Sequence, residues 1–551
     1  MMKSQLLKQP AFLLMGALLV FLILCPLASI FIKAVTAEGR LDFSYAAAIL
    51  SETGNAHMIG NSLLLGALVV LTSTVIALPL AYLFSRTDFS RHTYFDILFL
   101  IPFMTPPYIA SMGWILFMQK RGLLSQMVPA LPDGCPPFFT LGGLVLVMSL
   151  HIFPFMVTIL KNAMGNIPSS LEEAASVLGA GWSLRMRKIL LPLLSGSYAI
   201  AALLVFVKTL SEYGTPYTLG RRIGFDVFTT DIHRYAAVAP ISFGSAAVLA
   251  SVLVTICLLL WMVQHRITER ASYRLVSGKG QRLHLLPLRG IASWCAWAYV
   301  TLILFLSIVI PYFSIITTSL IKLRGFGMAA GNFTLAHYSE LFASDENDAL
   351  AAMGNTFLTG LAAASICAAL GTAIVVVIRR ARRGGALMEA LSLLPEMLPG
   401  IVLVIGIMLF YNAIYTFLPL YNTLGILIVT YVILFLPFTV QYVTASFSQI
   451  SGSLIEAARV LGAGPFYIFR RITFPLLLKG IAAGWMMTFI ISLRELVAPS
   501  LIAPPNTLVI STFIMREFEQ GSVSLGMCMA VLCAAFTVAS LLLLRRSVKG
   551  M

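Results

Sequence analysis

Six ionisable side chains occur inside long apolar stretches of the sequence, where a charged group is costly. They are His151, Lys208, Glu212, Glu396, Arg494 and Glu495. Carboxylate groups supply the hard oxygen ligands that hard cations prefer, and lysine and arginine suit an anion equally well. Such groups inside apolar segments suggest a pathway for a charged solute. Buried charges also pair with one another for structural reasons alone, so both interpretations remain open.

The spacing of these side chains relates some of them to each other. Lys208 and Glu212 are four residues apart and share one face of a helix, which suits an internal ion pair as well as a pathway. Glu212 and Glu495 occupy equivalent positions in the two halves of an internal repeat, and for this pair a role on the pathway and a structural role are about equally supported. A lone histidine such as His151 is typically a hydrogen-bonded packing residue. The residues alone assign no metal site.

The segments that carry these side chains are too apolar for a soluble protein. Of the 551 residues, 59% are hydrophobic and 11% are charged, whereas soluble domains carry roughly 25% charged residues. A spanning helix needs about 20 apolar residues. Twelve segments qualify: Ala11–Ile32, Ile59–Phe84, Tyr94–Phe117, Leu141–Leu160, Ser197–Tyr217, Ile241–Val263, Gly290–Thr318, Asn355–Ile378, Met388–Tyr411, Leu424–Thr444, Gly480–Leu501 and Leu525–Leu544. We therefore predict an all-α polytopic membrane protein of about twelve transmembrane helices.

The excess of positive charge fits the same interpretation. The 37 Lys and Arg residues exceed the 22 Asp and Glu residues, which gives a formal net charge of +15. With the N-terminus inside the cell, most of the basic residues fall on the cytoplasmic side, including the cluster in segment 379–383. This distribution follows the positive-inside rule. We expect both termini in the cytoplasm, contact with membrane lipid and no binding of nucleic acid.

The chain consists of two copies of one design. Segment 173–192 reads EAASVLGAGWSLRMRKILLP, and segment 456–475 reads EAARVLGAGPFYIFRRITFP, at an offset of 283 residues. Further upstream the offset is 293 or 294, where GNS at 60–62 recurs as GNT at 354–356. Each copy holds six spans, so the two repeats run in parallel. We expect a first domain over residues 1–264, a cytoplasmic linker over 265–289 and a second domain over 290–551.

Each repeated segment lies between the fourth and fifth spans of its repeat, at residues 169–192 and 452–475, and is too polar to cross the membrane. Serines at its start offer N-cap groups, and Gly179 or Gly462 stops the helix as glycine does at a C′ position. A second, basic helix should end at Pro192 or Pro475. The residues predicted to contact another protein are Glu173, Ala174, Ala175 and Gly179 with Glu456, Ala457, Ala458 and Gly462. An amphipathic helix on the lipid surface is the alternative, but two equivalent copies favour docking.

The pattern E-A-A-x-x-x-G-A, followed by a basic stretch and a proline, resembles the EAA loop of ABC importer permeases. The resemblance covers nearly the whole chain, as two fused permease domains. It implies that the loops dock on two copies of a separate ATPase subunit that binds ATP and Mg²⁺, and that an extracytoplasmic binding protein delivers the solute. The chain itself lacks a G-x-x-x-x-G-K-[ST] phosphate loop, so the resemblance implies neither enzyme activity nor a bound cofactor. It also implies a multi-pass location in the bacterial cytoplasmic (inner) membrane.

Two short motifs make the resemblance more specific: IPFMTPPY at 101–108 and LSEYGTP at 210–216. With the fused architecture, they resemble the ferric-iron permeases, which implies ferric iron as the solute. Related fused permeases carry aminoethylphosphonate, thiamine or phosphorylated sugars, and these remain alternatives because their motifs overlap. An ion-coupled secondary transporter would also have twelve helices and buried carboxylates. It would have no reason to keep two EAA loops.

Overall fold

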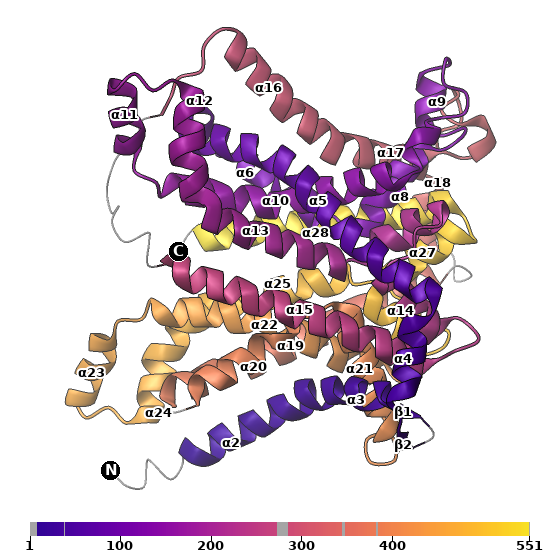
Figure 1. The fold of residues 1–551 in the computed structure, drawn as a ribbon. Helices are drawn as coiled ribbons and strands as arrows, with labels where there is room; N and C mark the ends of the chain where they lie inside the picture. The colour runs from indigo at the N-terminus through magenta and orange to yellow at the C-terminus, as the bar shows by residue number, and fades with distance from the viewer. Residues whose placement is uncertain (1–7, 38, 273–284, 344–347, 382–383, 550–551) are drawn as a thin grey trace. The chain divides into compact units, whose positions relative to one another are not determined.

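The computed structural model describes residues 8–37, 39–272, 285–343, 348–381 and 384–549, and most of these residues are helical (Figure 1). Ten helices are long and apolar enough to cross a membrane, and two bent helix pairs raise the count to as many as twelve within the described ranges. The one sheet in this part of the chain is a short antiparallel hairpin of β1 (Thr36–Ala37) and β2 (Arg40–Leu41). The predicted all-α polytopic fold is confirmed.

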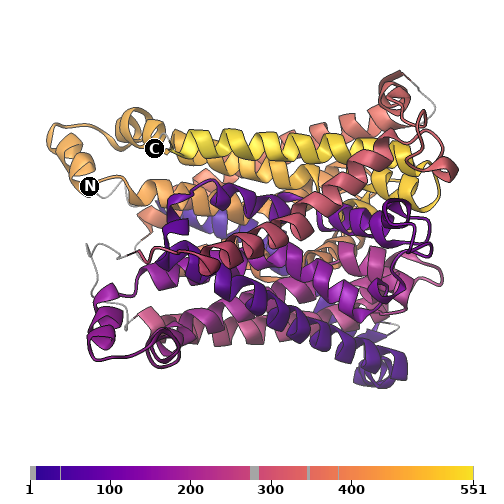
Figure 2. The same ribbon diagram turned by 90° about the horizontal axis from the view of Figure 1, so that it is seen from above.

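The ten continuous spans match ten of the predicted ones and extend beyond most of them. They are Pro10–Ala34, Thr53–Arg86, Leu141–Gly165, Trp182–Ser211, Phe243–Thr268, Ile291–Leu320, Ala349–Arg379, Leu424–Ser448, Pro465–Leu493 and Val523–Ser540. The last of these belongs to α28 (Val523–Lys549), which Figure 2 shows in yellow as one uninterrupted helix.

The third span of each repeat is broken in the middle. In the first repeat the helices over Phe95–Met104 and Pro107–Met127 meet at 90°, and in the second α20 (Gly385–Met397) and α21 (Gly400–Ala413) meet at 108°. The break falls at Pro106 and Pro399, the repeat-equivalent prolines, which have extended ψ angles of 132°. A proline has no N–H and disfavours helical geometry in the residue before it. Each proline therefore turns the chain within a segment that the sequence analysis predicts as one span.

Four other prolines change the winding of a helix without breaking it. A five-residue π segment precedes each of them by one residue, at Val20–Leu24, Met186–Leu190, Phe305–Val309 and Phe469–Thr473. The prolines are Pro26, Pro192, Pro311 and Pro475. Since proline cannot donate to the carbonyl four residues earlier, a wider turn relieves both the missing bond and the ring clash. The prediction that the basic helices end at Pro192 and Pro475 is therefore wrong, because each continues into the fifth span.

The repeated GNS and GNT triplets connect their helices by hydrogen bonds to a later helix of the same repeat. The Ser62 hydroxyl accepts a hydrogen bond of 2.8 Å from the N–H of Phe228, the first residue of α14 (Phe228–Ala237). The Thr356 hydroxyl accepts one of 2.8 Å from the N–H of Ile510, the first residue of α27 (Ile510–Glu519). Each hydroxyl thus satisfies an N–H that the helix itself leaves unbonded.

By packing, the chain divides into two compact units, one of residues 51–231 and 255–334. In this unit α5 (Thr53–Arg86), α10 (Leu141–Gly165) and α13 (Leu191–Ser211) pack together, and α8 (Pro107–Met118) packs on α17 (Ile310–Leu320). The α8–α17 contact is close, because a Cβ atom at Gly113 would lie 2.7 Å from the Pro311 carbonyl oxygen. The first span of the second repeat therefore packs within the unit that holds most of the first repeat.

The other unit comprises residues 1–50, 232–254 and 335–551 and repeats this arrangement. Its core combines α19 (Ala349–Arg380), α22 (Leu424–Ser448), α25 (Phe474–Leu493) and α28, while α3 (Cys25–Ala34) packs on α21 (Figure 1). Here a Cβ atom at Gly406 would lie 2.6 Å from the Pro26 carbonyl oxygen. The first span of the first repeat accordingly packs with the second repeat.

The two repeats thus exchange their first spans. The predicted domains 1–264 and 290–551 follow the sequence repeat and remain a prediction, because the packing units cut across that division. In the predicted linker 265–289, residues 265–272 continue the helix α15 (Phe243–Ser272), and residues 273–284 lie outside the described part.

Candidate functional site

The first of the two polar loops folds as a short helix, a tight turn and a second helix. The first helix, α11 (Ser169–Val177), ends in a left-handed residue, Gly179, with φ +82°. The Ala180 N–H donates to the Ala175 carbonyl at 2.9 Å, and the Gly179 N–H donates to the Ser176 carbonyl at 3.0 Å. This pair of bonds is the Schellman motif, which favours glycine at its left-handed position. The predicted stop at Gly179 is confirmed.

The second loop has the same geometry at the same offset. Its helix α23 (Gly452–Val460) ends at Gly462, again with φ +82°. The Ala463 N–H donates to the Ala458 carbonyl at 3.0 Å, and the Gly462 N–H donates to the Arg459 carbonyl at 3.0 Å. The turn is thus present twice, in one copy per packing unit.

The starts of these helices differ from the sequence prediction. The N-cap of α11 is Pro168, and the N-cap of α23 is Ser451, whose side chain makes no capping hydrogen bond. Instead, the hydroxyls of Ser451 and Ser453 lie 2.6 Å apart and bond each other. Proline preceding α11 sets the backbone direction by its own restricted φ, so serine capping is not needed there.

The turn carries apolar side chains that face outward. Val177 and Leu178 are 88% and 87% exposed, and Val460 and Leu461 are both 87% exposed. Glu173, Ala174, Glu456 and Ala457 are exposed as well, whereas Ala458 is buried. Adjacent exposed apolar residues on a protruding loop are unfavourable in water and indicate a surface that another molecule covers.

The first loop is attached to the second span by contacts that the sequence analysis missed. Arg86, the last residue of α5, is 3% exposed, and its Nε lies 3.3 Å from Oε1 of Glu172. Its Nη2 donates to the Ile167 carbonyl at 2.9 Å. In addition, Trp182 Nε1 donates to the Tyr82 hydroxyl at 2.9 Å. An arginine that ends an apolar span next to an acidic loop is the one signal that could have suggested the pair.

The second loop lacks the residues for these contacts. At the offset of 283, Glu172 corresponds to Ile455, and Trp182 corresponds to Pro465. Neither replacement carries a side-chain donor or acceptor. The two loops therefore share a backbone turn and differ in their attachment to the spans.

The repeat-related glutamates Glu212 and Glu495 lie just after the fifth span of each repeat and adopt the same arrangement. The Glu212 carboxylate accepts the N–H of Thr215 at 3.1 Å, and the Glu495 carboxylate accepts the N–H of Val497 at 2.9 Å. Both carboxylates are thereby held at the start of the following helical segment, where negative charge is favourable.

Their backbone carbonyls are matched too. The Glu212 carbonyl accepts the Thr229 hydroxyl at 2.8 Å, and the Glu495 carbonyl accepts the Ser511 hydroxyl. Thr229 and Ser511 are the second residues of α14 and α27. The predicted equivalence of the two glutamates therefore holds in their local geometry.

The remaining four ionisable residues have separate surroundings. Lys208 is in the last turn of α13, and Arg494 directly follows α25. Glu396, on α20, accepts a hydrogen bond from the Gln441 amide. The buried His151 ring lies 6.2 Å from the Phe103 ring, centre to centre. Each packing unit holds three of the six residues, and no group of three His, Cys, Asp or Glu positioned to hold a metal ion occurs among the described residues.

Comparison with known proteins bears directly on these features. The model of the family described as binding-protein-dependent transport system inner membrane component matches residues 73–272 and 360–550. The ferric transport system permease protein FbpB of Actinobacillus pleuropneumoniae is 27% identical over 516 residues, which cover 92% of this chain and 73% of that protein. The Fe(3+)-transport system permease protein FbpB 2 of Haemophilus influenzae is 25% identical over 548 residues, covering 98% and 99%. The spermidine/putrescine transport system permease protein PotC of Escherichia coli is 27% identical over 246 residues, covering 44% and 90%.

Proposed function

Because this chain belongs to the family of binding-protein-dependent transport system inner membrane components, we propose that it forms the translocation path of an ATP-driven importer for ferric iron. The observation that carries the proposal is the matched pair of loop turns. A chain that did not dock on an ATPase subunit would have no need of two copies of this loop. Iron as the cargo is supported by the two full-length relatives named for ferric transport. The half-length polyamine relative matches only one repeat-sized part of the chain.

The two loops are the proposed docking sites for two copies of an ATPase subunit, which would bind ATP and Mg²⁺. Glu173, Ala174, Ala175 and Gly179 belong to one proposed site, and Glu456, Ala457, Ala458 and Gly462 to the other, in which Ala458 is buried and adds no exposed surface. The support lies in their matched, hydrogen-bonded turns and in the exposed apolar pairs next to the glycines. Aligned small residues allow close approach by a partner helix, and the apolar pairs supply surface to bury. An extracytoplasmic binding protein would deliver the cargo on the opposite side.

The proposed path uses Glu212 and Glu495 as its main polar groups, with Glu396, Lys208, Arg494 and His151 as further candidates. Hard oxygen ligands suit a hard cation, and the two glutamates are held in place by backbone N–H groups. In a path, a carboxylate must attract the ion without trapping it. Hydrogen bonds to backbone N–H groups delocalise part of its charge and help to meet that condition.

Orientation in the membrane is part of the same proposal. Both loops, both termini and the 265–289 linker face the cytoplasm of the bacterial inner membrane. This follows from the concentration of basic residues in those segments.

Growth and uptake of a deletion strain test the function. The strain should grow poorly on limiting iron and should lose uptake of radioactive ferric iron, and plasmid-borne wild-type chain should restore both. Growth on aminoethylphosphonate as the sole phosphorus source, and on limiting thiamine, should be normal. A defect only on phosphonate or thiamine would reject iron. Purification of the chain without any co-purifying ATPase subunit, with uptake that depends on an ion gradient, would reject the importer class.

A further inference from the structure

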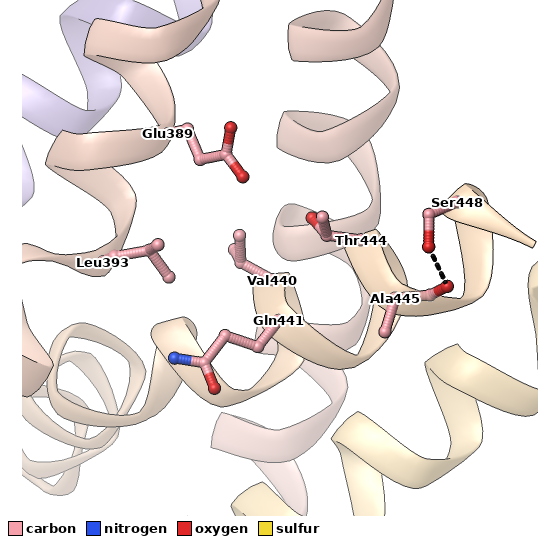
Figure 3. Close-up of a pocket in the computed structure, with 7 residues that line it drawn as sticks. All are labelled: Glu389, Leu393, Val440, Gln441, Thr444, Ala445 and Ser448. Carbon is pink, nitrogen blue, oxygen red and sulfur yellow. Dashed lines mark hydrogen bonds between the residues drawn. The ribbon is translucent and has the colours of Figure 1, made fainter. Parts of the chain in front are cut away.

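A cavity of about 220 Å³ lies between α20 and α22 in the second repeat (Figure 3). Its polar lining comes from Glu389, Gln441, Thr444 and Ser448, and its apolar lining includes Leu393 and Val440. Figure 3 shows the Glu389 carboxylate directed from α20 toward Val440 and Thr444 on α22. Ser448 is the last residue of α22, so the cavity adjoins the second loop.

Glu389 differs from the other glutamate on the same helix. Glu396 accepts a hydrogen bond from the Gln441 amide. The Glu389 carboxylate has no hydrogen bond or ion pair with any residue in the described ranges, while its backbone carbonyl accepts the Ser392 hydroxyl. Toward the described residues, the carboxylate therefore keeps its four acceptor sites open for a ligand.

In the first repeat, a lysine of the chain itself occupies the position that is equivalent to the cavity. At the offset of 293, Glu389 corresponds to Asp96, and at the offset of 283, Thr444 corresponds to Lys161. The Lys161 ammonium lies 2.5 Å from Asp96 Oδ1, so the first repeat fills the equivalent position with a cation of its own. In the second repeat the acid is retained and the lysine is replaced by a shorter hydroxyl side chain, where the cavity lies.

From this comparison we propose that the Glu389 cavity binds a ligand carrying a primary ammonium group, which takes the place that Lys161 occupies in the first repeat. An ammonium has three N–H donors and no acceptor. The lining offers it the Glu389 carboxylate and the Thr444 hydroxyl oxygen, whereas the Gln441 amide is directed away from them (Figure 3) and donates to Glu396. The Ser448 hydroxyl already donates to the Ala445 carbonyl, which leaves its oxygen free to accept.

The size of the cavity indicates more than a bare ion. One water-sized group takes about 30 Å³ in the liquid, so the ammonium can enter with the carbon chain attached to it, as Lys161 does from its own backbone. The apolar lining suits such methylene groups. Two sources present this chemistry: the headgroup of phosphatidylethanolamine from the surrounding membrane, and a free amine in the cytoplasm. The site does not depend on the identity of the transported solute.

Native mass spectrometry of the purified full-length chain tests the site with three probes: phosphatidylethanolamine, phosphatidylglycerol and free ethanolamine. The wild type should retain one phosphatidylethanolamine or one ethanolamine in preference to phosphatidylglycerol, which has no amine. Retention should weaken at least tenfold in Glu389→Gln and in Thr444→Lys, since the first removes the charge and the second fills the site. Retention of the lipid alone would identify the membrane as the source, and retention of ethanolamine would identify the cytoplasm.

A variant of the first repeat provides the converse test. Lys161→Thr leaves Asp96 facing an opened position and should add a second amine ligand, whereas the double variant Asp96→Asn/Lys161→Thr should add none. Thermal unfolding verifies that each variant is folded, and Thr444→Lys should unfold at a higher temperature than Glu389→Gln. Equal retention of phosphatidylglycerol and phosphatidylethanolamine by the wild type, or unchanged amine retention in both Glu389→Gln and Thr444→Lys, would overturn the proposal. So would a folded Lys161→Thr variant that gains no ligand.

Discussion

Gly406 lies against Pro26 so closely that a Cβ atom on the glycine would be 2.6 Å from the proline carbonyl oxygen. Gly113 and Pro311 repeat this relationship, with a separation of 2.7 Å. The glycines belong to the second helices of the two broken spans, α8 and α21, and the prolines belong to the first spans of the opposite repeats. These contacts hold the exchanged helices.

Gly406→Ala and Gly113→Ala should each destabilise the protein by about 1–3 kcal/mol, because a methyl group forced against a backbone carbonyl displaces a packed helix. Thermal unfolding in detergent measures the loss. Gly354→Ala is the matched control, since that glycine is also helical but has no atom within 4 Å of its added Cβ. An unchanged unfolding temperature in both Gly406→Ala and Gly113→Ala would show that the contact is looser than described.

Gly179→Val and Gly462→Val should abolish coupled transport while leaving the chain in the membrane. Both glycines have φ +82°, where a β-branched residue is strained by about 1–3 kcal/mol, so the turn has to rearrange. Retention of the ATPase subunit on purification should fall, and substrate-stimulated ATP hydrolysis should fall with it. Gly181→Val and Gly464→Val serve as controls, because those glycines have extended backbone angles that valine adopts. Normal coupled hydrolysis in the Gly179→Val/Gly462→Val double variant would exclude the docking role.

Arg86→Met should disturb the first loop alone. The substitution leaves the Glu172 carboxylate without its partner in a site that is nearly closed to solvent. Removing one partner of a buried ion pair lowers the free energy of unfolding by about 3 kcal/mol. We expect faster protease cleavage within 169–192 and unchanged cleavage within 452–475. Arg86→Met/Glu172→Ile should restore wild-type resistance, since isoleucine is the residue that the second repeat carries at position 455. If the double variant is cleaved as fast as the single one, the pair does not attach the loop.

Glu212→Gln and Glu495→Gln should reduce iron uptake per assembled complex without loss of protein yield. Glutamine keeps a side-chain oxygen to accept the N–H groups of Thr215 and Val497, so the local fold survives while the charge is removed. Uptake in the double variant should fall at least tenfold. A fall in yield before any fall in uptake per complex would instead assign the glutamates to structural pairing with Lys208 and Arg494. Full uptake in the double variant would remove them from the path.

Cysteine labelling tests the orientation. In a background without the seven native cysteines, single cysteines at Ser170, Ser453 and Ser277, the last lying outside the described residues, should resist an impermeant thiol reagent in intact cells. They should react after the membrane is opened. Labelling of any of the three in intact cells would reverse the assigned topology.

Sequence patterns within single segments predicted most of this fold. The contacts between segments could not be predicted from such patterns. Apolar length located ten continuous spans, and glycine preference located the turns at Gly179 and Gly462. A proline in a hydrophobic run predicts some change in a helix, but the same residue type bends the chain at Pro106 and only widens it at Pro192. Thr105, before Pro106, has an extended backbone, whereas Leu191, before Pro192, keeps helical angles, and the proline alone does not distinguish the two cases.

The candidate sites follow the same rule. Equivalence of Glu212 and Glu495 was visible in the repeat, because both copies keep the residue. The Arg86–Glu172 pair joins two segments far apart in the chain and occurs in one copy only, so the repeat gives no signal for it. The Asp96–Lys161 pair gives no repeat signal either, since the lysine has no counterpart in the second repeat.

The exchange of first spans has a consequence for synthesis. Helix α3 ends at Ala34, whereas its partner α21 begins at Gly400. At a translation rate of about 5–20 residues per second, α3 waits in the membrane for roughly 20 to 70 s before its partner emerges. During that time it needs a temporary neighbour, such as the insertion machinery. A gene cut in the linker would make two half-chains, each carrying a first span that belongs with the other half. We expect neither half to mature when expressed alone, and both to mature when expressed together.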